Sequence, residues 1–276
     1  MTAQGTARRA GDSDALEHLA RIGLIAFGVV HLLVAWLALQ LAWFGGGGES
    51  ADQSGAMATL AESPIGKPLL WIVAVGLIAL AVWQAAEVLR WKNGWSASGK
   101  QRTKALRKSG NALVKAVVYV TLAVLAIRFA TGSGQSSSSS QQETTAGVLG
   151  WPGGQFLVGA AGLILIGVGA WHIRKGINKH FLKQIDTSGA SPTAVRLVTR
   201  LGQIGFPGKG VALIGVGGLL VWAAVTFDPS KAQGLDGALH GVLELPFGRI
   251  LLTLVAICIA SFGAFCFVRA RYPERT

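Results

Sequence analysis

Four of the polar side chains that interrupt the long apolar runs of this 276-residue sequence are its first candidates for chemistry. They are His31, Gln84, Tyr119 and His172. Polar groups held inside a membrane commonly belong to a substrate or proton pathway, so these residues are functional candidates. A side chain hydrogen-bonded between packed helices explains the same residues without a pathway. Both interpretations stay open from the sequence.

No residue spacing in the chain predicts catalysis. The segment Gly205–Gly210 resembles a phosphate-binding loop, but a glycine follows Lys209 where magnesium binding needs Ser or Thr. Cys258 and Cys266 lie about 12 Å apart along one predicted helix, which is too far for a disulfide. No Ser, Cys, His or acidic spacing suggests hydrolysis, and no paired metal ligands occur. We therefore expect a non-enzymatic protein without a cofactor or a metal.

The composition predicts a membrane protein. Apolar residues make up 51% of the chain and charged residues 14%, while the net charge is +12. Such a charge would normally suggest a nucleic-acid partner. Here the Lys and Arg residues are confined to alternate loops between segments that are too apolar for a soluble fold. We therefore expect the lipid bilayer as the partner, and no nucleic acid.

Six apolar runs have the length that crosses a hydrocarbon layer of roughly 30 Å. Their helical length, together with the need to satisfy backbone groups inside lipid, favours helices over barrel strands. The predicted fold class is therefore all-α, a polytopic bundle of six transmembrane helices. The runs are Leu19–Trp43, Pro68–Leu89, Ala112–Ala130, Gln155–Ile173, Val211–Phe227 (with a start as early as Leu201) and Ile250–Val268.

The distribution of charge predicts that both chain ends lie in the cytoplasm. All Lys and Arg residues except Lys67, Arg128, Lys231 and Arg249 fall at the N-terminus, in the 90–115 and 174–209 loops, or at the C-terminus. Cytoplasmic loops retain such cations. The predicted outer loops, which include Gly45–Gly48 and the serine run 136–140, are typical of solvated linkers.

An internal repeat divides the chain into three parallel two-helix units. A Pro-x-Gly sequence opens every even-numbered helix, at offsets of 88 and then 94 residues. The same offsets align His31 with Tyr119 in the odd-numbered helices. These openings consist of Pro64, Gly66 and Lys67, then Pro152, Gly154 and Gln155, then Pro246, Gly248 and Arg249. Three like hairpins predict a bundle with pseudo-threefold symmetry.

The repeat also sets the expected boundaries of the chain. We expect a cytoplasmic tail over residues 1–18, repeat units over 19–91, 92–177 and 178–272, and a second cytoplasmic tail over 273–276. The basic cytoplasmic linkers of the second and third units begin at residues 92 and 178. Small residues at matching positions of the odd helices are expected to allow close helix packing.

Charged positions at both ends of the even helices have structural explanations. Lys67 and Arg249 oppose the helix dipole at the outer interface, so we expect them to anchor the turn through lipid phosphate or nearby acids. Glu87, Lys175 and Arg269 share one repeat position at the cytoplasmic boundary. Unlike charges there are expected to pair between neighbouring hairpins, and the alternative is a binding site.

The chain resembles a bacterial family, common in actinobacteria, that is catalogued as domain of unknown function 1206. Pro246-Phe-Gly-Arg249 matches the family's helix opening letter for letter, while the first two copies depart from it at 65, 67, 153 and 155. The resemblance runs from about Leu19 to Arg271. It implies six helices in a bacterial inner membrane, and it implies no activity.

Two classes of function remain open on the sequence. The first, which we favour, is a structural or accessory protein that organises lipid or assists other membrane machinery. Its partners would be anionic lipids at the cytoplasmic face and a further membrane protein. The second is a transporter or permeation protein whose path would be lined by His31, Gln84 and Tyr119. The expected location for either is the bacterial inner (plasma) membrane, with multiple passes and both termini inside.

Overall fold

The structure is a computed structural model that describes residues 14–45, 49–185 and 191–272. Within these ranges the chain is helical and contains no strand. Of the two predicted tails, residues 1–13 and 273–276 lie outside the described residues, as do the glycines 46–48. Residues 14–18, which were predicted to belong to the first tail, instead form the start of a helix. The helices are α2 (Asp14–Phe44), α3 (Gln53–Glu62), α4 (Gly66–Trp91), η1 (Lys92–Ser96), α5 (Gly99–Ala130), α6 (Ser137–Leu149), α7 (Gly154–Ile177), η2 (His180–Gln184), α8 (Pro192–Thr226), η3 (Pro229–Lys231), α9 (Gly234–Leu243) and α10 (Gly248–Arg271).

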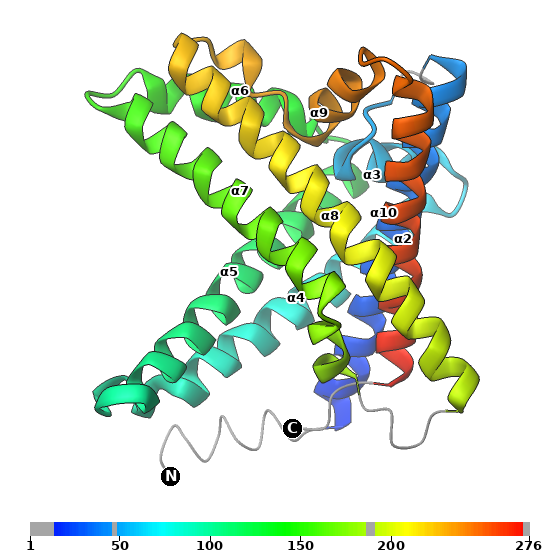
Figure 1. Ribbon diagram of the computed structural model, residues 1–276. Helices are drawn as coiled ribbons and strands as arrows, with labels where there is room; N and C mark the ends of the chain where they lie inside the picture. The colour runs from blue at the N-terminus through cyan, green and yellow to red at the C-terminus, as the bar shows by residue number, and fades with distance from the viewer. Residues whose placement is uncertain (1–13, 46–48, 186–190, 273–276) are drawn as a thin grey trace.

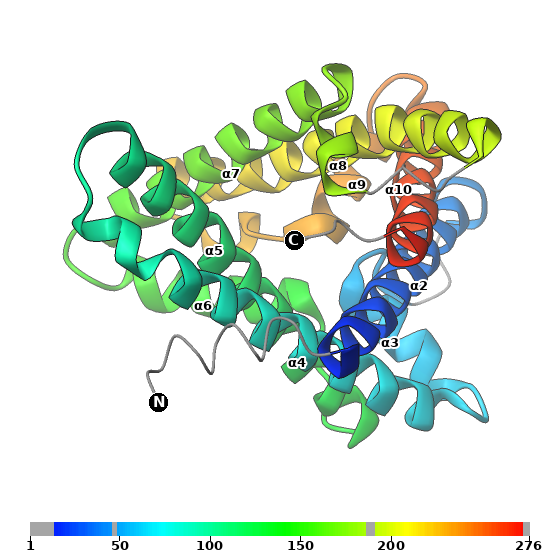
Figure 2. The ribbon, with the colours of Figure 1, turned by 90° about the horizontal axis from the view of Figure 1, so that it is seen from below.

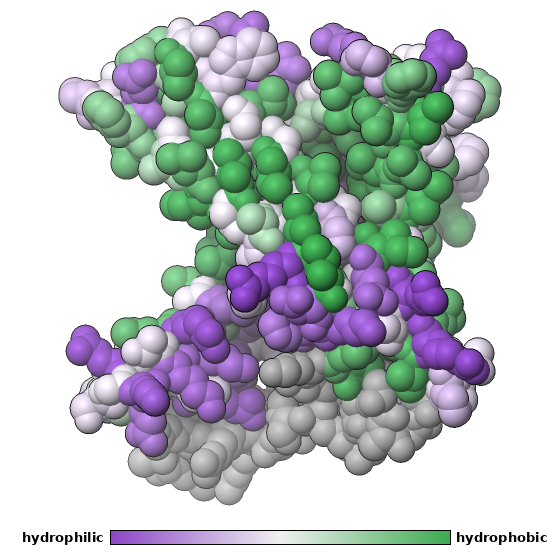
Figure 3. Space-filling view, in the orientation of Figure 1, coloured by the Kyte–Doolittle hydropathy of each residue, from purple (hydrophilic) through white to green (hydrophobic). Residues whose placement is uncertain are grey.

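Six of these helices are long and apolar enough to cross a membrane, which confirms the predicted all-α membrane fold. They are α2, α4, α5, α7, α8 and α10 (Figure 1). Apolar side chains such as Trp36, Val82 and Ile164 remain exposed on them, as expected for helices that face lipid. In Figure 3 hydrophobic residues cover much of the upper part, while hydrophilic ones gather over the lower part.

Each repeat consists of a long helix, a short helix and a second long helix. The short helices α3, α6 and α9 gather at one end of the bundle, which we call the outer end (Figure 1). Helix α2 begins, and α10 ends, at the opposite or inner end. The serine run was wrongly predicted to be a linker. Ser136 caps α6 by accepting a hydrogen bond from the Ser139 N–H, which is the usual role of serine at a helix start.

The most extensive contacts between long helices join different repeats, and those between the two long helices of one repeat are smaller. The closest pairs are α7 with α8, α4 with α5, and α10 with α2. The second long helix of each repeat therefore packs on the first long helix of the following repeat. The second long helix of the last repeat packs on the first long helix of the first repeat, which closes the bundle. Seen from below, the three pairs form the sides of a triangle (Figure 2).

Small residues form the seams of these pairs. A Cβ atom added at Gly28 would lie 2.9 Å from the Gly263 carbonyl oxygen, and the reverse distance is also 2.9 Å. Gly169 and Gly210 meet in the same way at 2.6 and 2.5 Å. The repeat offsets place Ala81 and Ala116 at the equivalent positions of the α4–α5 pair. Close backbone approach of this kind stabilises helix pairs in lipid, where no hydrophobic driving force acts between helices.

Each seam has a second contact, which lies seven residues from the first on both helices. Gly162 and Gly217 approach within 2.7 and 2.6 Å by the same measure. The equivalent positions hold Ala74 and Ala123 in the α4–α5 pair, and Ala35 and Ala256 in the α2–α10 pair. All four alanines are buried. The three pairs therefore share one packing register, set by the repeat.

The triangle is not uniform. Helices α2 and α4 pack on each other, as do α8 and α10, whereas α5 and α7 of the middle repeat pack far less and diverge in Figure 2. Helices α5 and α8 also begin much earlier than predicted, at Gly99 and Pro192. The apolar run marks only the membrane portion of each helix. A segment rich in Lys and Arg precedes this portion and extends the helix toward the inner end.

Candidate functional site

His31 lies in a shell of aromatic rings between α2 and α10. Its ring centroid is 4.3 Å from that of Phe27 and 5.0 Å from that of Phe262. The His31 side chain is 7% exposed, and Nδ1 bonds with the Phe27 carbonyl oxygen at 2.8 Å. One ring nitrogen is therefore satisfied by its own helix, and the ring faces are covered by carbon.

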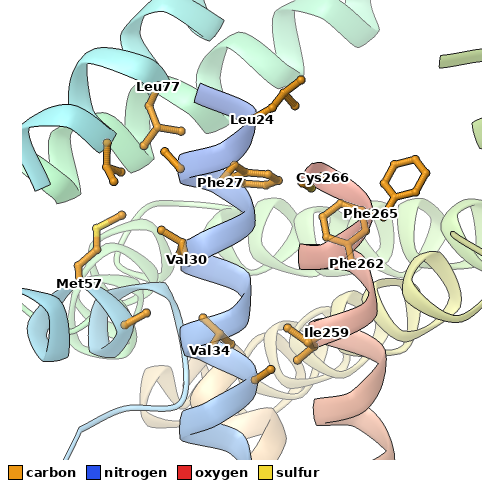
Figure 4. Packing of buried hydrophobic residues seen from close by; sticks show 14 of the residues in the cluster. Leu24, Phe27, Val30, Val34, Met57, Leu77, Ile259, Phe262, Phe265 and Cys266 are labelled. Carbon is orange, nitrogen blue, oxygen red and sulfur yellow. The ribbon is translucent and has the colours of Figure 1, made fainter. Parts of the chain in front are cut away.

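The rings around His31 belong to a larger cluster, which we call the aromatic centre: Phe27, His31, Phe206, Phe262 and Phe265. Figure 4 shows Phe27 on α2 facing Phe262 and Phe265 on α10. Phe206 of α8 contacts Phe262 at 5.3 Å and Phe265 at 5.1 Å in edge-on geometry. Such ring pairs stabilise a core beyond the area that they bury. The aromatic centre joins the third repeat to the first.

Two of the other predicted polar residues, Tyr119 and His172, contact the aromatic centre. Tyr119 of α5 is buried and meets Phe27 edge-on at 6.0 Å. Gln84 of α4 is buried, and its side chain makes no hydrogen bond with the described residues. His172 of α7 bonds with the Val168 carbonyl oxygen and stacks on Phe206 at 6.1 Å. His172 therefore approaches the centre from the far side of α8.

Lys209 is a residue of this region that the sequence interpretation missed. It was assigned to a cytoplasmic loop, but it lies inside α8, where its side chain is partly buried. Its Nζ is 4.4 Å from the Phe262 ring centroid and 5.2 Å from that of Phe27. The signal that would have located it is the repeat, because the offsets align Lys209 with Lys115 and with Phe27 on the odd helices.

The charges at the inner end pair differently from the prediction. Glu87 accepts hydrogen bonds from Arg90 at 3.0 Å and from the Trp91 indole at 2.8 Å, both on its own helix. Lys175 lies over the Phe206 ring at 4.3 Å. Among the described residues Arg269 forms no ion pair with a carboxylate. The shared repeat position thus holds one local pair and two cations near the aromatic centre.

The three helix openings have a common geometry at the outer end. The N–H groups of Gly66, Gly154 and Gly248 donate to the carbonyl oxygen three residues earlier, at 2.9, 2.9 and 2.8 Å. A Cβ atom at any of them would overlap a carbonyl oxygen of the preceding short helix. Pro64, Pro152 and Pro246 occupy the second position of these turns, where proline is favoured. The Pro-x-Gly motif therefore builds the tight connection from each short helix into the following long one.

The cations after these glycines face outward. Lys67 and Arg249 are exposed, and neither forms an ion pair within the described part of the chain, so the expected pairs with Glu62 and Glu244 are absent there. Gln155 occupies the equivalent place. Gly248 and Arg249 help to line an open hollow of about 600 Å³ between the ends of α2 and α10.

Hydrogen bonds tie the three short helices together at the outer end. The Ser137 N–H donates to Ser54 Oγ at 2.8 Å, which joins α6 to α3. The hydroxyl of Ser138 donates to the carbonyl oxygen of Gln233, which joins α6 to the start of α9. The N–H of Ala51 donates to Asp236 Oδ1 at 2.6 Å and completes the circuit. We call these helices and their bonds the outer ring.

Asp52 is the buried acid of the outer ring. Its Oδ1 accepts hydrogen bonds from the N–H groups of Ser54 and Gly55, while its buried Oδ2 has no hydrogen-bond partner among the described residues. Burial therefore raises the pKa of Asp52 above its ordinary value of 3.8, against the opposing effect of these bonds. Burial also raises the pKa of Glu49 nearby. Within the described residues no group of three His, Cys, Asp or Glu side chains could hold a metal ion.

Comparison with known proteins identifies the family. The family model described as Domain of Unknown Function (DUF1206) matches residues 22–90, 111–179 and 204–273. The uncharacterized protein YxxB of Bacillus subtilis (strain 168) is 31% identical over 261 residues, covering 95% of this chain and 92% of that protein. No solved structure matches. With one family match in each repeat, and a relative aligned along nearly the whole length, the chain belongs to the Domain of Unknown Function (DUF1206) family.

Proposed function

We propose that this protein is a non-enzymatic structural or accessory protein of the bacterial plasma membrane, and not a transporter. The observation that carries the proposal is the packing around His31. Aromatic rings cover the imidazole, and one of its nitrogens bonds with the backbone of its own helix. A permeation path would need polar groups that are open to water.

The glycine seams support the same proposal. Seams such as Gly28–Gly263 and Gly169–Gly210 bring backbones into contact along α2–α10 and α7–α8. Transporters, in contrast, usually interrupt helices near the middle of the membrane to bind their substrates. Pro207 lies within α8, but this helix runs unbroken from Pro192 to Thr226. Continuous, tightly packed helices suit a rigid scaffold.

The orientation and partners belong to the proposal as well. The basic inner segments, such as the exposed start of α5 at Lys100–Lys108, favour the cytoplasm for the inner end. They would also attract anionic lipids, at about 1 kcal/mol for each basic residue. The exposed faces of α5 and α7 leave room for lipid or for a second membrane protein.

Thiol labelling tests this proposal. His31→Cys and Gln84→Cys are made in a variant that carries Cys258→Ala and Cys266→Ala, and a membrane-impermeant thiol reagent is added to each side of the membrane. We expect both positions to stay unlabelled, because packed side chains exclude the reagent. Labelling of His31→Cys from either side at the rate of an exposed control would favour a water-filled path and transport.

Two exposed positions serve as controls and also report the orientation. Glu143 lies on α6 at the outer end, and Lys104 lies near the start of α5 at the inner end. We expect Glu143→Cys to be labelled in intact cells, and Lys104→Cys only after the membrane is permeabilised. The reverse pattern would contradict the proposed orientation.

A further inference from the structure

Three hydrogen-bond donors from three helices gather beside the aromatic centre. Lys209 of α8 lies over the rings of Phe27 and Phe262. Arg269 of α10 follows Phe262 by seven residues, so it lies on the same face of this helix, two turns nearer the inner end. Tyr119 of α5 packs edge-on against the same Phe27 ring that lies under Lys209. The three donors thus come from α8, α10 and α5, one helix of each repeat pair.

The two cations of this group have no carboxylate partner within the described residues. Both Lys209 and Arg269 are partly buried, and neither forms an ion pair there. Glu87, the acid that shares the repeat position of Arg269, bonds with Arg90 and Trp91 instead. Two like charges without a counter-charge are unfavourable near an apolar interior, where they are poorly screened.

The chemistry of the three groups selects an anion. Lys has three N–H donors and Arg has five, and neither has an acceptor. A tyrosine hydroxyl adds one more donor, and no hydrogen bond occupies the Tyr119 hydroxyl within the described structure. Phosphate oxygens are strong acceptors that Arg and Lys bind together. A phosphate group would satisfy the donors and neutralise both cations.

The depth of the group also fits a phosphate. Helix α10 begins at Gly248 at the outer end, and Arg269 follows after a rise of about 31 Å. A hydrocarbon layer is roughly 30 Å thick, so Arg269 lies near the level of the inner headgroups. The Lys209 ammonium lies over the ring of Phe262, two turns before Arg269 on α10, and therefore on the apolar side of this level.

The geometry points to an anion site in which Lys209, Arg269 and Tyr119 bind one phosphate group between α8, α10 and α5. The phosphate is carried either by an anionic lipid of the inner leaflet or by a free solute. The site goes beyond the proposed structural role, because it assigns a ligand class to three named residues. A purely structural Lys209, satisfied by the two rings alone, would bind neither.

The test is ligand binding to the purified protein in a zwitterionic detergent. Phosphatidylglycerol, phosphatidylcholine and inorganic phosphate are titrated separately, and binding is followed by thermal stabilisation and by native mass spectrometry. We expect Lys209→Gln to weaken the anion about tenfold, the effect of losing a charged hydrogen bond. Lys209→Arg keeps the charge and should stay within about threefold of the wild type.

Lys104→Gln is the matched control, because Lys104 also lies over a ring, that of Trp91 at 5.8 Å, but is exposed. It should bind like the wild type. Stabilisation by phosphatidylglycerol alone assigns the site to lipid, and stabilisation by inorganic phosphate assigns it to a solute. The proposal is overturned if neither binds, if phosphatidylcholine binds equally well, or if Lys209→Gln binds like the wild type. Should Lys209→Gln fail to fold, Tyr119→Phe and Arg269→Gln are subject to the same criteria.

Discussion

The outer ring and the aromatic centre hold the same three repeats together by opposite means. At the outer end, backbone and side-chain hydrogen bonds join α3, α6 and α9, and a buried carboxyl, Asp52, caps one of the helices. In the membrane portion the joints are rings and glycine contacts. Hydrogen-bonding side chains suit the end that meets water, whereas lipid leaves close packing as the main source of helix association. The two regions should therefore respond to different changes, pH in one and side-chain volume in the other.

The largest expected effect is in the aromatic centre. Phe262 contacts Phe27, His31, Phe206 and Phe265, so Phe262→Ala removes the ring that links them. We expect a loss of about 4 kcal/mol in the free energy of unfolding, measured by denaturation in detergent. The control is Phe156→Ala on α7, where the side chain is 78% exposed and little should be lost. Equal effects of the two changes would contradict the assigned core.

The glycine seam should give the next effect. A Cβ atom at Gly169 would lie 2.6 Å from the Gly210 carbonyl oxygen, and neither backbone can move without parting α7 from α8. We expect Gly169→Ala to cost about 2 kcal/mol, in the range seen for overpacking. Gly167, on the same helix, has open space around its Cβ position. Gly167→Ala should therefore be neutral or slightly stabilising when both variants are measured by denaturation in detergent.

The outer ring should respond to pH through Asp52. Because its folded pKa is raised, its contribution to stability is fully present below the ordinary value of 3.8 and is lost as the pH rises through the folded pKa. Asp52→Asn keeps the cap but cannot ionise. We expect its melting temperature, relative to the wild type, to increase by about 3 °C between pH 4 and pH 7.

Asp228 offers a contrast with the opposite sign. Its pKa is lowered, first by hydrogen bonds with Ser230, so its contribution is present above the ordinary value of 3.8 and is lost as the pH falls. Asp228→Asn should lose stability relative to the wild type as the pH rises. Parallel pH profiles for the two variants would contradict the burial of Asp52.

The smallest effect is expected at His31. A phenylalanine at this position fits a shell that is already aromatic, and it loses one hydrogen bond with a carbonyl oxygen of its own helix. His31→Phe should therefore change the free energy of unfolding by less than about 1.5 kcal/mol. A much larger loss, with expression unchanged, would indicate that the imidazole nitrogens hold the centre together.

Much of the fold could be predicted from the sequence because its signals are local or periodic. Apolar length gave the six spans, and the spacing of Gly66, Gly154 and Gly248 gave the three repeats. The pairing of α10 with α2 could not be predicted, since no local signal says which helices meet in space. Helix α6 was missed because serine is a weak helix former whose capping role depends on its position.

The candidate site was predicted only in part, for a related reason. Polar residues inside apolar runs pointed to His31 and Tyr119, and both side chains pack against the ring of Phe27. Lys209 was missed because a lysine at the edge of an apolar run looks like a loop residue. The basic start of α8 conceals the length of this helix, and the repeat alignment with Phe27 was the remaining signal for the position of Lys209 inside the bundle.

The closure of the last repeat onto the first is the central claim, and one cross-link tests it most directly. A Cβ atom at Gly28 would lie 3.3 Å from Cβ of the native Cys266, close to the separation found in disulfides. We predict that Gly28→Cys, in a variant carrying Cys258→Ala, forms a disulfide with Cys266 on mild oxidation. The bond is detected after cleavage of the chain between them, on a non-reducing gel. Two separate fragments, with both thiols still open to a permeant maleimide, would contradict the arrangement.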